Sequence, residues 1–243
     1  MNEQQVVNII KSGHDWALYN IPFIVEHQDK FIYDLNVSHA NFKDVFVNAD
    51  SSLTRRDQLK LGDIPRLFNH VETSPNSIAN ELEEIKSNPG AAHITHSGYS
   101  FYNIFSLTSP SPYFYELYAI FRNIVRMHLG TRPMWFQCWM NFHSSDSVLN
   151  WHNHAFPYHG YISIDPHNTT TLFKDHDDPA TVEHAPMLYE IENRPGQLYF
   201  GPGWRPHKVQ VNEEFDRPRL TLGFDISFQA DIPDSQFSMH PLL

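Results

Sequence analysis

The chain has 243 residues and a formal net charge of −11 at neutral pH, a length that suits one large domain or a domain with a substantial extension. The negative charge argues against an extended nucleic-acid surface or an anionic-membrane surface, because phosphate groups are bound by clustered Lys and Arg. The 18 Phe, 11 Tyr and 5 Trp favour a β-rich core.

Cysteine content and hydropathy give an expected location. Cys138 is the only cysteine of the chain, so no internal disulfide forms and a reducing compartment fits. The first 16 residues lack the basic region and apolar run of a secretory signal. No stretch approaches the ~20 apolar residues of a membrane span. We therefore expect a soluble, cytoplasmic protein.

Residues 1–110 show mixed patterns and are predicted to form a mixed α/β extension packed on the rest of the chain. Short apolar runs such as Phe31-Ile32-Tyr33 lie among polar segments. One helix is predicted from Ser77 to Lys86, with Ser77 as its N-cap and apolar residues at helical spacing. The segment His93-Ile94-Thr95-His96 is predicted to be a loop or a short strand.

The clearest helix is predicted from Tyr113 to Leu129, where large apolar and aromatic side chains recur at three- and four-residue steps. Pro110-Ser111-Pro112 precedes this helix and Gly130 suits its end. Residues 111–243 are predicted to form one unit, in which this long helix supports a β-rich core.

After Pro133 the hydrophobic period changes to two, which predicts a strand from Met134 to Phe142 with Gln137 and Asn141 on a face turned toward a polar pocket. Six shorter strands follow, separated by Pro, Gly, Asn and Asp. They are predicted at Tyr158–Ile164, Thr170–Phe173, Met187–Ile191, Gln197–Phe200, His207–Val211 and Leu220–Phe228. Because no helical pattern lies between them, a mainly β fold of the antiparallel sandwich or barrel type is expected.

The most informative motif is Trp151-His152-Asn153-His154. If this segment is a strand, alternate side chains share a face, so His152 and His154 point into one pocket. A third imidazole from His207 would close one face of a metal ion and leave the other open for chemistry. The chain holds 16 histidines, so the His-x-His pair also arises by chance, and loop histidines remain an alternative.

The second half of the chain resembles the Fe(II)- and 2-oxoglutarate-dependent oxygenase superfamily, and within it a bacterial and phage branch. The resemblance covers roughly residues 133–228 and depends on the order of its motifs more than on any one of them. The motifs are Trp139-Met140-Asn141, Trp151 to His154, Gly160 to Ser163, Pro195 to Gly201, Trp204 to Val209 and Arg219 to Ile226. The resemblance implies a double-stranded β-helix, or jelly roll, that binds Fe(II), 2-oxoglutarate and O₂.

The resemblance also implies a ligand set of the form H-x-D/E…H. His152 matches its first position and His207 its last, whereas His154 stands where the superfamily most often has a carboxylate. Three alternatives stay open at this point. His154 is itself the third ligand; Asp165, Asp175 or a water fills the position; or His154 lies outside the coordination shell.

A cosubstrate site follows from the same resemblance. The distal carboxylate of 2-oxoglutarate requires a permanent cation, and a guanidinium grips it with two parallel hydrogen bonds. Arg219 is expected in this role with Thr221 beside it, and Arg217 is the substitute if the register differs. Gln137 and Asn141 are expected to hydrogen-bond cosubstrate or substrate, or else to be satisfied polar residues of the strand.

The predicted function is therefore an oxygenase, most often a hydroxylase in this superfamily, acting on a small molecule, an amino acid or a peptide side chain. A homodimer is compatible with it. One alternative is a cupin-type metalloenzyme with three histidines that does not use 2-oxoglutarate. Another is a non-catalytic β-sandwich that binds a ligand or a partner. Arg219-x-Thr221 favours the first, because neither alternative explains it.

Overall fold

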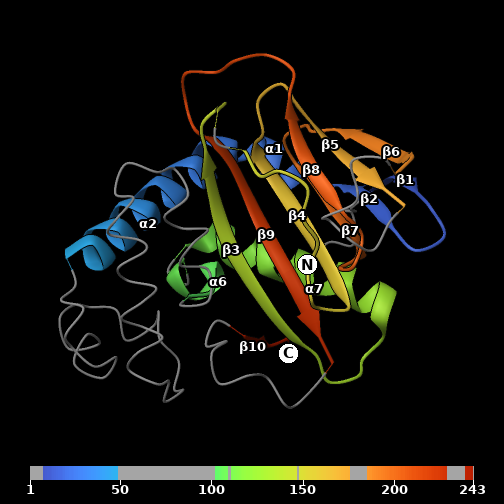
Figure 1. Cartoon of the computed structure of the whole chain (residues 1–243). Helices are drawn as coiled ribbons and strands as arrows, with labels where there is room; N and C mark the ends of the chain where they lie inside the picture. Colours follow the sequence, from blue (N-terminus) through green and yellow to red (C-terminus); the bar gives the residue numbers. More distant parts are fainter. Residues whose placement is uncertain are drawn as a thin grey trace. The chain divides into compact units, whose positions relative to one another are not determined.

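The computed structural model of the chain describes residues 8–48, 102–108, 111–146, 148–175, 185–228 and 239–242 (Figure 1). The chain forms two compact units. Unit 1 comprises Met1–Ile32 and Asn141–Ser227, and unit 2 comprises Tyr33–Met140 and Phe228–Leu243. The boundary near residue 110 that the sequence suggested stays a prediction. None of the helices in the described ranges combines the length and hydrophobicity that a membrane span needs.

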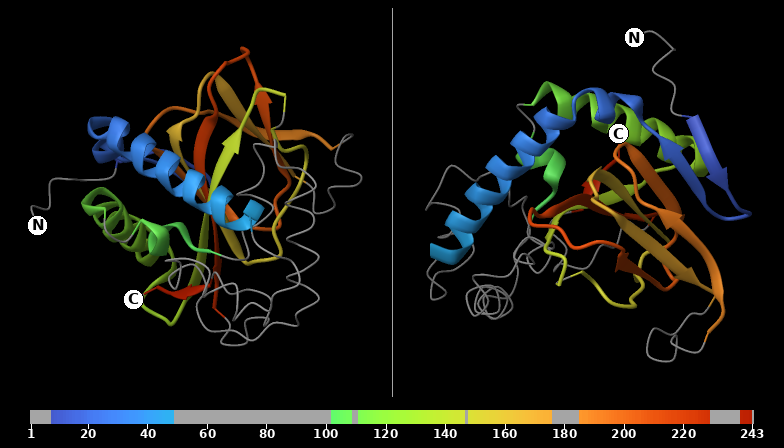
Figure 2. Two further views of the ribbon diagram at one scale, coloured as in Figure 1. Left: turned by 90° about the vertical axis from the view of Figure 1, so that its left-hand side faces the viewer. Right: turned by 90° about the horizontal axis from the view of Figure 1, so that it is seen from above.

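The larger sheet of unit 1 contains five hydrogen-bonded strands in the order β1-β2-β7-β4-β9, with antiparallel neighbours. β4, β7 and β9 run side by side in Figure 1, and β1 and β2 form the blue hairpin of Figure 2. The strands are β1 (Asn8–Ser12), β2 (Ala17–Asn20), β4 (Tyr158–Asp165), β7 (Gln197–Pro202) and β9 (Arg219–Ser227).

A smaller sheet of unit 1 has the order β6-β5-β8, again antiparallel throughout. Its strands are β5 (Thr169–Lys174), β6 (Met187–Glu192) and β8 (His207–Val211). Both sheets contribute to one buried cluster, which contains Tyr161 and Tyr199 from the larger sheet and Phe173 and Ile191 from the smaller one. The mainly β, antiparallel jelly-roll prediction is confirmed.

The register of the larger sheet decides which side chains share its faces. His159 is paired with Asp225, and Ser163 with Thr221. Since residues directly opposite each other in an antiparallel pair point to the same side, these polar residues share a face with Tyr161. All five are buried. One face of β4 and β9 is therefore lined by polar and ionisable groups, as a binding site requires.

Unit 2 is built around α7 (Pro112–Leu129), which has Ser111 as its N-cap and Gly130 as its C-cap. The Ser111 side chain accepts a hydrogen bond from the Phe114 N–H (3.3 Å), and Gly130 adopts a positive φ of 76°, a conformation that favours glycine. Phe121 of α7 packs on Phe136, with ring centroids 5.4 Å apart. The predicted helix from Tyr113 to Leu129 is confirmed.

The remaining elements were predicted in part. β3 (Trp135–His143) confirms the strand after Pro133 and passes from unit 2 into unit 1 at Asn141. The sequence did not predict β1, β2 or α2, and the predicted helix at 77–86 and the 93–96 segment lie outside the described residues. The other elements are α1 (Pro22–Glu26), α2 (Gln28–Asn48), α6 (Ile104–Leu107) and β10 (His240–Pro241).

Candidate metal centre and anion site

His152 and His154 lie on a loop before β4, not on the expected strand. The loop is anchored at two points. His152 and His207 form an isolated β-bridge, and the His154 N–H donates to the Gly203 carbonyl (2.8 Å). These backbone bonds bring the loop against the start of β8. The two histidines therefore share one space because of the bridge to β8 rather than because of strand alternation.

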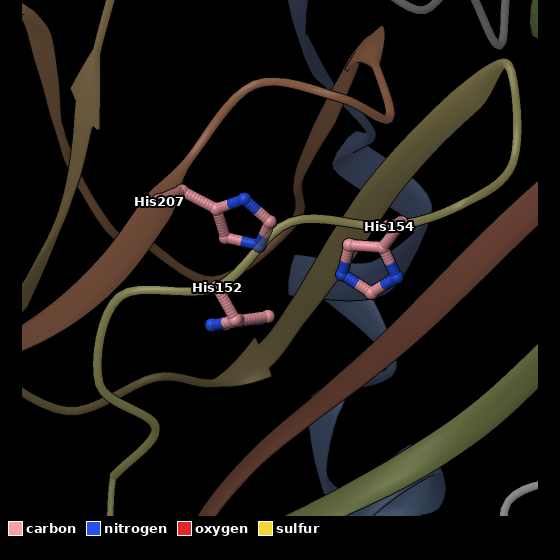
Figure 3. Close-up of side chains that lie close together, drawn as sticks. All are labelled: His152, His154 and His207. Carbon is pink, nitrogen blue, oxygen red and sulfur yellow. The ribbon is translucent and has the colours of Figure 1, made fainter. Parts of the chain in front are cut away.

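The imidazoles of His152, His154 and His207 converge (Figure 3). One nitrogen from each lies within 4.8 Å of the others. The ring centroids are 4.3 Å apart for His152 and His207, and 5.4 Å apart for each pair that includes His154. Two imidazoles bound to one ion at ~2.1 Å and ~90–110° have centroids ~4.5–5.3 Å apart. The observed separations lie within about 0.2 Å of this range, so the three rings fit a divalent transition-metal ion.

The tautomers of the three imidazoles also fit metal binding. The Nδ1 atom of His152 lies 2.7 Å from the Asn150 carbonyl oxygen, and that of His207 lies 3.1 Å from the Arg205 carbonyl oxygen. Nδ1 of His154 lies 3.1 Å from a carboxylate oxygen of Asp225. Each acceptor favours a proton on Nδ1, which leaves the Nε2 lone pair as the metal ligand.

A second group, formed by His154, His159 and Asp225, overlaps the first. Asp225 lies 3.0 Å from Nδ1 of His159 as well as close to His154. The rings of His154 and His159 are stacked with centroids 3.6 Å apart, which corresponds to a ligand angle of only ~70° at a shared ion. This group is better explained as two imidazoles hydrogen-bonded to one carboxylate.

Burial sets the protonation states in this cluster. Burial and then the charge of neighbouring imidazoles hold the pKa of His207 well below its usual range, and burial lowers the pKa of His159 to about 4. Burial alone raises the pKa of Asp225, but His154 and His159 outweigh it and hold that pKa below its usual range. At neutral pH, His207 and His159 are neutral and Asp225 is ionised.

Arg219 forms an anion site on the same face of β9. Its side chain is buried, donating from Nε to the Thr169 hydroxyl (3.4 Å) and from Nη1 to the Thr221 hydroxyl (3.2 Å). Burial lowers the pKa of Arg219 to about 10, still well above neutral. Within the described ranges no carboxylate forms an ion pair with Arg219. A buried guanidinium surrounded by hydroxyl groups is a binding site for an anion.

Further polar groups surround Arg219. Asn141 donates from Nδ2 to the Thr221 hydroxyl (3.3 Å), and Tyr161 is near enough for its pKa, which burial raises, to be affected by the charge of Arg219. The buried Ser163 hydroxyl, opposite Thr221, has no hydrogen-bond partner among the described residues. An anion bound here would meet hydroxyl donors as well as the guanidinium.

Arg217 and Gln137 were expected at the cosubstrate site, but the structure does not place them beside Arg219. The Arg217 side chain is 68% exposed and lies 3.7 Å from Asp165, so it is not the buried cation of this site. Gln137 is buried on β3 in unit 2, and its expected role stays a prediction. Neither Asp165 nor Asp175 belongs to a metal-binding group of the described residues, so neither supplies the carboxylate that the sequence left open.

Sequence reasoning missed His159 and Asp225. Both were identifiable by strand alternation, because His159, Tyr161 and Ser163 occur at every second position of β4. Asp225 likewise follows Arg219 and Thr221 at even spacing on β9. The missing information was the register that places His159 opposite Asp225.

No protein-family model and no curated protein sequence matches this chain. Solved structures similar to it include a 2OG-Fe(II) oxygenase family oxidoreductase from Burkholderia pseudomallei (14% identity, 49% of this chain and 59% of that chain, TM-score 0.36). HygX from Streptomyces hygroscopicus, solved with iron bound, is also similar (14%, 48% and 68%, TM-score 0.36).

A third similar structure is the ribosomal oxygenase YcfD from Escherichia coli in complex with cobalt and 2-oxoglutarate (14% identity, 49% of this chain and 29% of that chain, TM-score 0.34). The matched region is less than two thirds of the Burkholderia and Escherichia chains. Of these three structures, the Burkholderia protein is named as a member of the 2OG-Fe(II) oxygenase family, and each shares 14% identity with this chain over about half of its length.

Proposed function

We propose that this chain is an Fe(II)- and 2-oxoglutarate-dependent oxygenase that hydroxylates a small molecule, an amino acid or a peptide side chain. The observation that carries the proposal is the combination, within unit 1, of three convergent imidazoles and the buried, positively charged Arg219 without a carboxylate partner in the described ranges. The sequence motifs resemble those of this superfamily, and its chemistry requires both parts.

The metal would be held by Nε2 of His152, His154 and His207, which all approach from one side. Three ligands on one face leave the other coordination positions for cosubstrate and O₂. When bound, Fe(II) supplies the activation of O₂ that accompanies oxidative decarboxylation of 2-oxoglutarate to succinate and CO₂. The protein contributes fixed imidazole orientations, because each Nδ1 has its own acceptor.

The cosubstrate would be held at its far end by Arg219. A guanidinium matches a carboxylate with two parallel hydrogen bonds, and the buried site strengthens them by excluding water. Thr221 would add a hydroxyl donor, and Asn141 orients that hydroxyl through its own hydrogen bond (3.3 Å). This arrangement favours a small dicarboxylate over a neutral ligand.

The test is an anaerobic titration of the Fe(II)-loaded protein with 2-oxoglutarate, observed through the weak visible metal-to-ligand charge-transfer band. We expect the band in the wild type and in Arg217→Met, and at least ~100-fold weaker binding in Arg219→Met, because a charge-assisted pair contributes ~3 kcal/mol. The exposed Arg217 is the matched control. An Fe(II)-loaded wild type without the band would contradict the proposal.

The all-histidine ligand set supports one alternative, a cupin-type metalloenzyme that does not use 2-oxoglutarate. In such an enzyme the same three histidines would bind the metal, but Arg219 would have no role in the reaction. In that case iron binds, 2-oxoglutarate produces no band, and Arg219→Met leaves O₂-dependent turnover unchanged. The same titration therefore separates the two functions.

A further inference from the structure

We propose that Asp225 is a positioning residue for the metal centre: it orients His154 as a ligand and supplies, one hydrogen bond away from the ion, the negative charge that a carboxylate ligand would bring. His159, bound to the same carboxylate, supports the ring of His154 and stays out of the coordination shell. The inference rests on the proposed function and deepens it, because it explains how a histidine serves in the position of a carboxylate.

The geometry of Asp225 supports its role in orienting His154. Its side chain is 3% exposed and lies on β9, whose backbone is fixed in the larger sheet. Oδ1 lies 3.1 Å from Nδ1 of His154 and 3.0 Å from Nδ1 of His159. A carboxylate without a proton only accepts hydrogen bonds, so it selects the Nδ1-protonated tautomer of both rings. Nε2 of His154 is then the atom that binds the ion.

His159 completes the support of His154. Its ring stacks on that of His154 with an interplanar angle of 12°, and its centroid is 4.8 Å from that of His207. With Nδ1 tied to Asp225 and one ring face covered, His154 has little freedom to turn. We infer that His159 limits the orientations of His154 rather than adding a fourth ligand.

The charge of the site supports the second part of the proposal, that Asp225 supplies the negative charge of a carboxylate ligand. Three neutral imidazoles leave a divalent ion with its full charge of about +2 in a partly buried cluster, whereas one carboxylate ligand reduces this to about +1. Asp225 restores that reduction through its hydrogen bond to His154, and such carboxylate–histidine contacts also increase ligand basicity. Compared with a carboxylate ligand, the negative charge of Asp225 lies farther from the ion, but the net charge of the cluster is the same.

The test is a titration with Co(II), a spectroscopic probe of coordination, in wild type and variants without 2-oxoglutarate. We expect Asp225→Asn to weaken Co(II) binding ~10–100-fold, the range observed when the hydrogen-bond partner of a ligating histidine is replaced. His159→Asn retains a side-chain N–H near the position of Nδ1, so its affinity should stay within ~3-fold of wild type. Asp165→Asn, on the neighbouring β4, is the matched control and should bind as wild type does.

A measurement on unaltered protein keeps the test decisive if Asp225→Asn fails to fold. In ¹⁵N NMR of metal-free wild type, His154 should carry its proton on Nδ1, and a proton on Nε2 would overturn the proposal. Equal Co(II) binding by wild type and Asp225→Asn would overturn it while leaving the proposed function intact. So would loss of binding in His159→Asn with normal binding in His152→Ala. A wild type that binds no Co(II) would overturn both proposals.

Discussion

Asp15 and Arg205 form a bidentate ion pair that connects the hairpin of β1 and β2 to the turn before β8. Nη1 and Nη2 of Arg205 lie 3.1 and 2.8 Å from the two carboxylate oxygens of Asp15. The carbonyl oxygen of the same arginine accepts from Nδ1 of the candidate ligand His207 (3.1 Å). The N-terminal hairpin is thereby linked to the metal centre through one residue.

This pair should matter more than a surface salt bridge. Asp15→Ala leaves the buried Arg205 guanidinium without its carboxylate, so we expect a loss of about 1–3 kcal/mol in the free energy of unfolding. Glu192→Ala removes the exposed pair with Arg194 (3.1 Å) and should change stability by less than ~1 kcal/mol. Urea unfolding of the two variants compares them directly. Equal effects would mean that the Asp15 pair is no stronger than a surface pair.

Arg219 should stabilise a bound anion, but it should lower the folding stability of the ligand-free protein. Burial without a carboxylate lowers its pKa to about 10, which reflects the free-energy cost of keeping its charge away from water. Arg219→Met should therefore raise the stability of the metal-free, cosubstrate-free protein by on the order of 1–3 kcal/mol. Thermal unfolding checks this, with Arg217→Met expected to be neutral. A destabilised Arg219→Met would show that its hydrogen bonds to Thr169 and Thr221 outweigh the buried charge.

Metal-free protein should lose stability as the pH falls from about 6.5 to 4. The folded-state pKa of His159 is about 4 and its unfolded reference is 6.5, so in this window the unfolded state binds a proton that the folded state does not. Stability then decreases with decreasing pH, by about 2 kcal/mol between pH 7 and 5 from this group. Urea unfolding with a chelator present measures it. His159→Asn should flatten the dependence, and an unchanged slope would assign it to other groups.

Gly160 should tolerate no side chain. A Cβ at this position would overlap the Tyr199 carbonyl oxygen and the Phe224 ring, which belong to the two strands beside β4. We expect Gly160→Ala to destabilise the protein by about 3 kcal/mol or more, because backbone and core must both move. Gly130→Ala meets no atom within 4 Å, so its loss of about 1–3 kcal/mol would come from the backbone conformation alone (φ 76°, ψ −162°). A loss in Gly160→Ala no larger than that in Gly130→Ala would contradict the steric explanation.

The periodic parts of the fold were predictable from sequence. The helix α7 and the strands β3 to β9 follow from local repeats of apolar residues, which reflect the faces that each element buries. β1 and β2 were not predicted, since Ile9 and Ile10 are exposed and the short hairpin lacks a repeat long enough to detect. α2 has a weak apolar pattern, so its helical period was not detectable from the sequence.

The candidate site divides in the same way. His152, His207, Arg219 and Thr221 were identifiable because short motifs retain their order along the chain. Sequence alone determined the residue types, the mainly β class and the presence of an imidazole where a carboxylate was expected. It did not determine which residue supplies the negative charge that this carboxylate would have contributed.

Only the tertiary structure decided the partners. Asp225 meets His159 because β4 and β9 pair in one particular register, and a shift by one residue would turn every side chain to the opposite face. His154 meets the same carboxylate from the loop before β4, which its N–H holds against the Gly203 carbonyl. Arg219 rather than Arg217 is buried because β9 begins at Arg219, whereas Arg217 lies on the exposed segment before the strand. Register depends on contacts between segments far apart in the chain, and hydrogen bonds and burial across those segments select it.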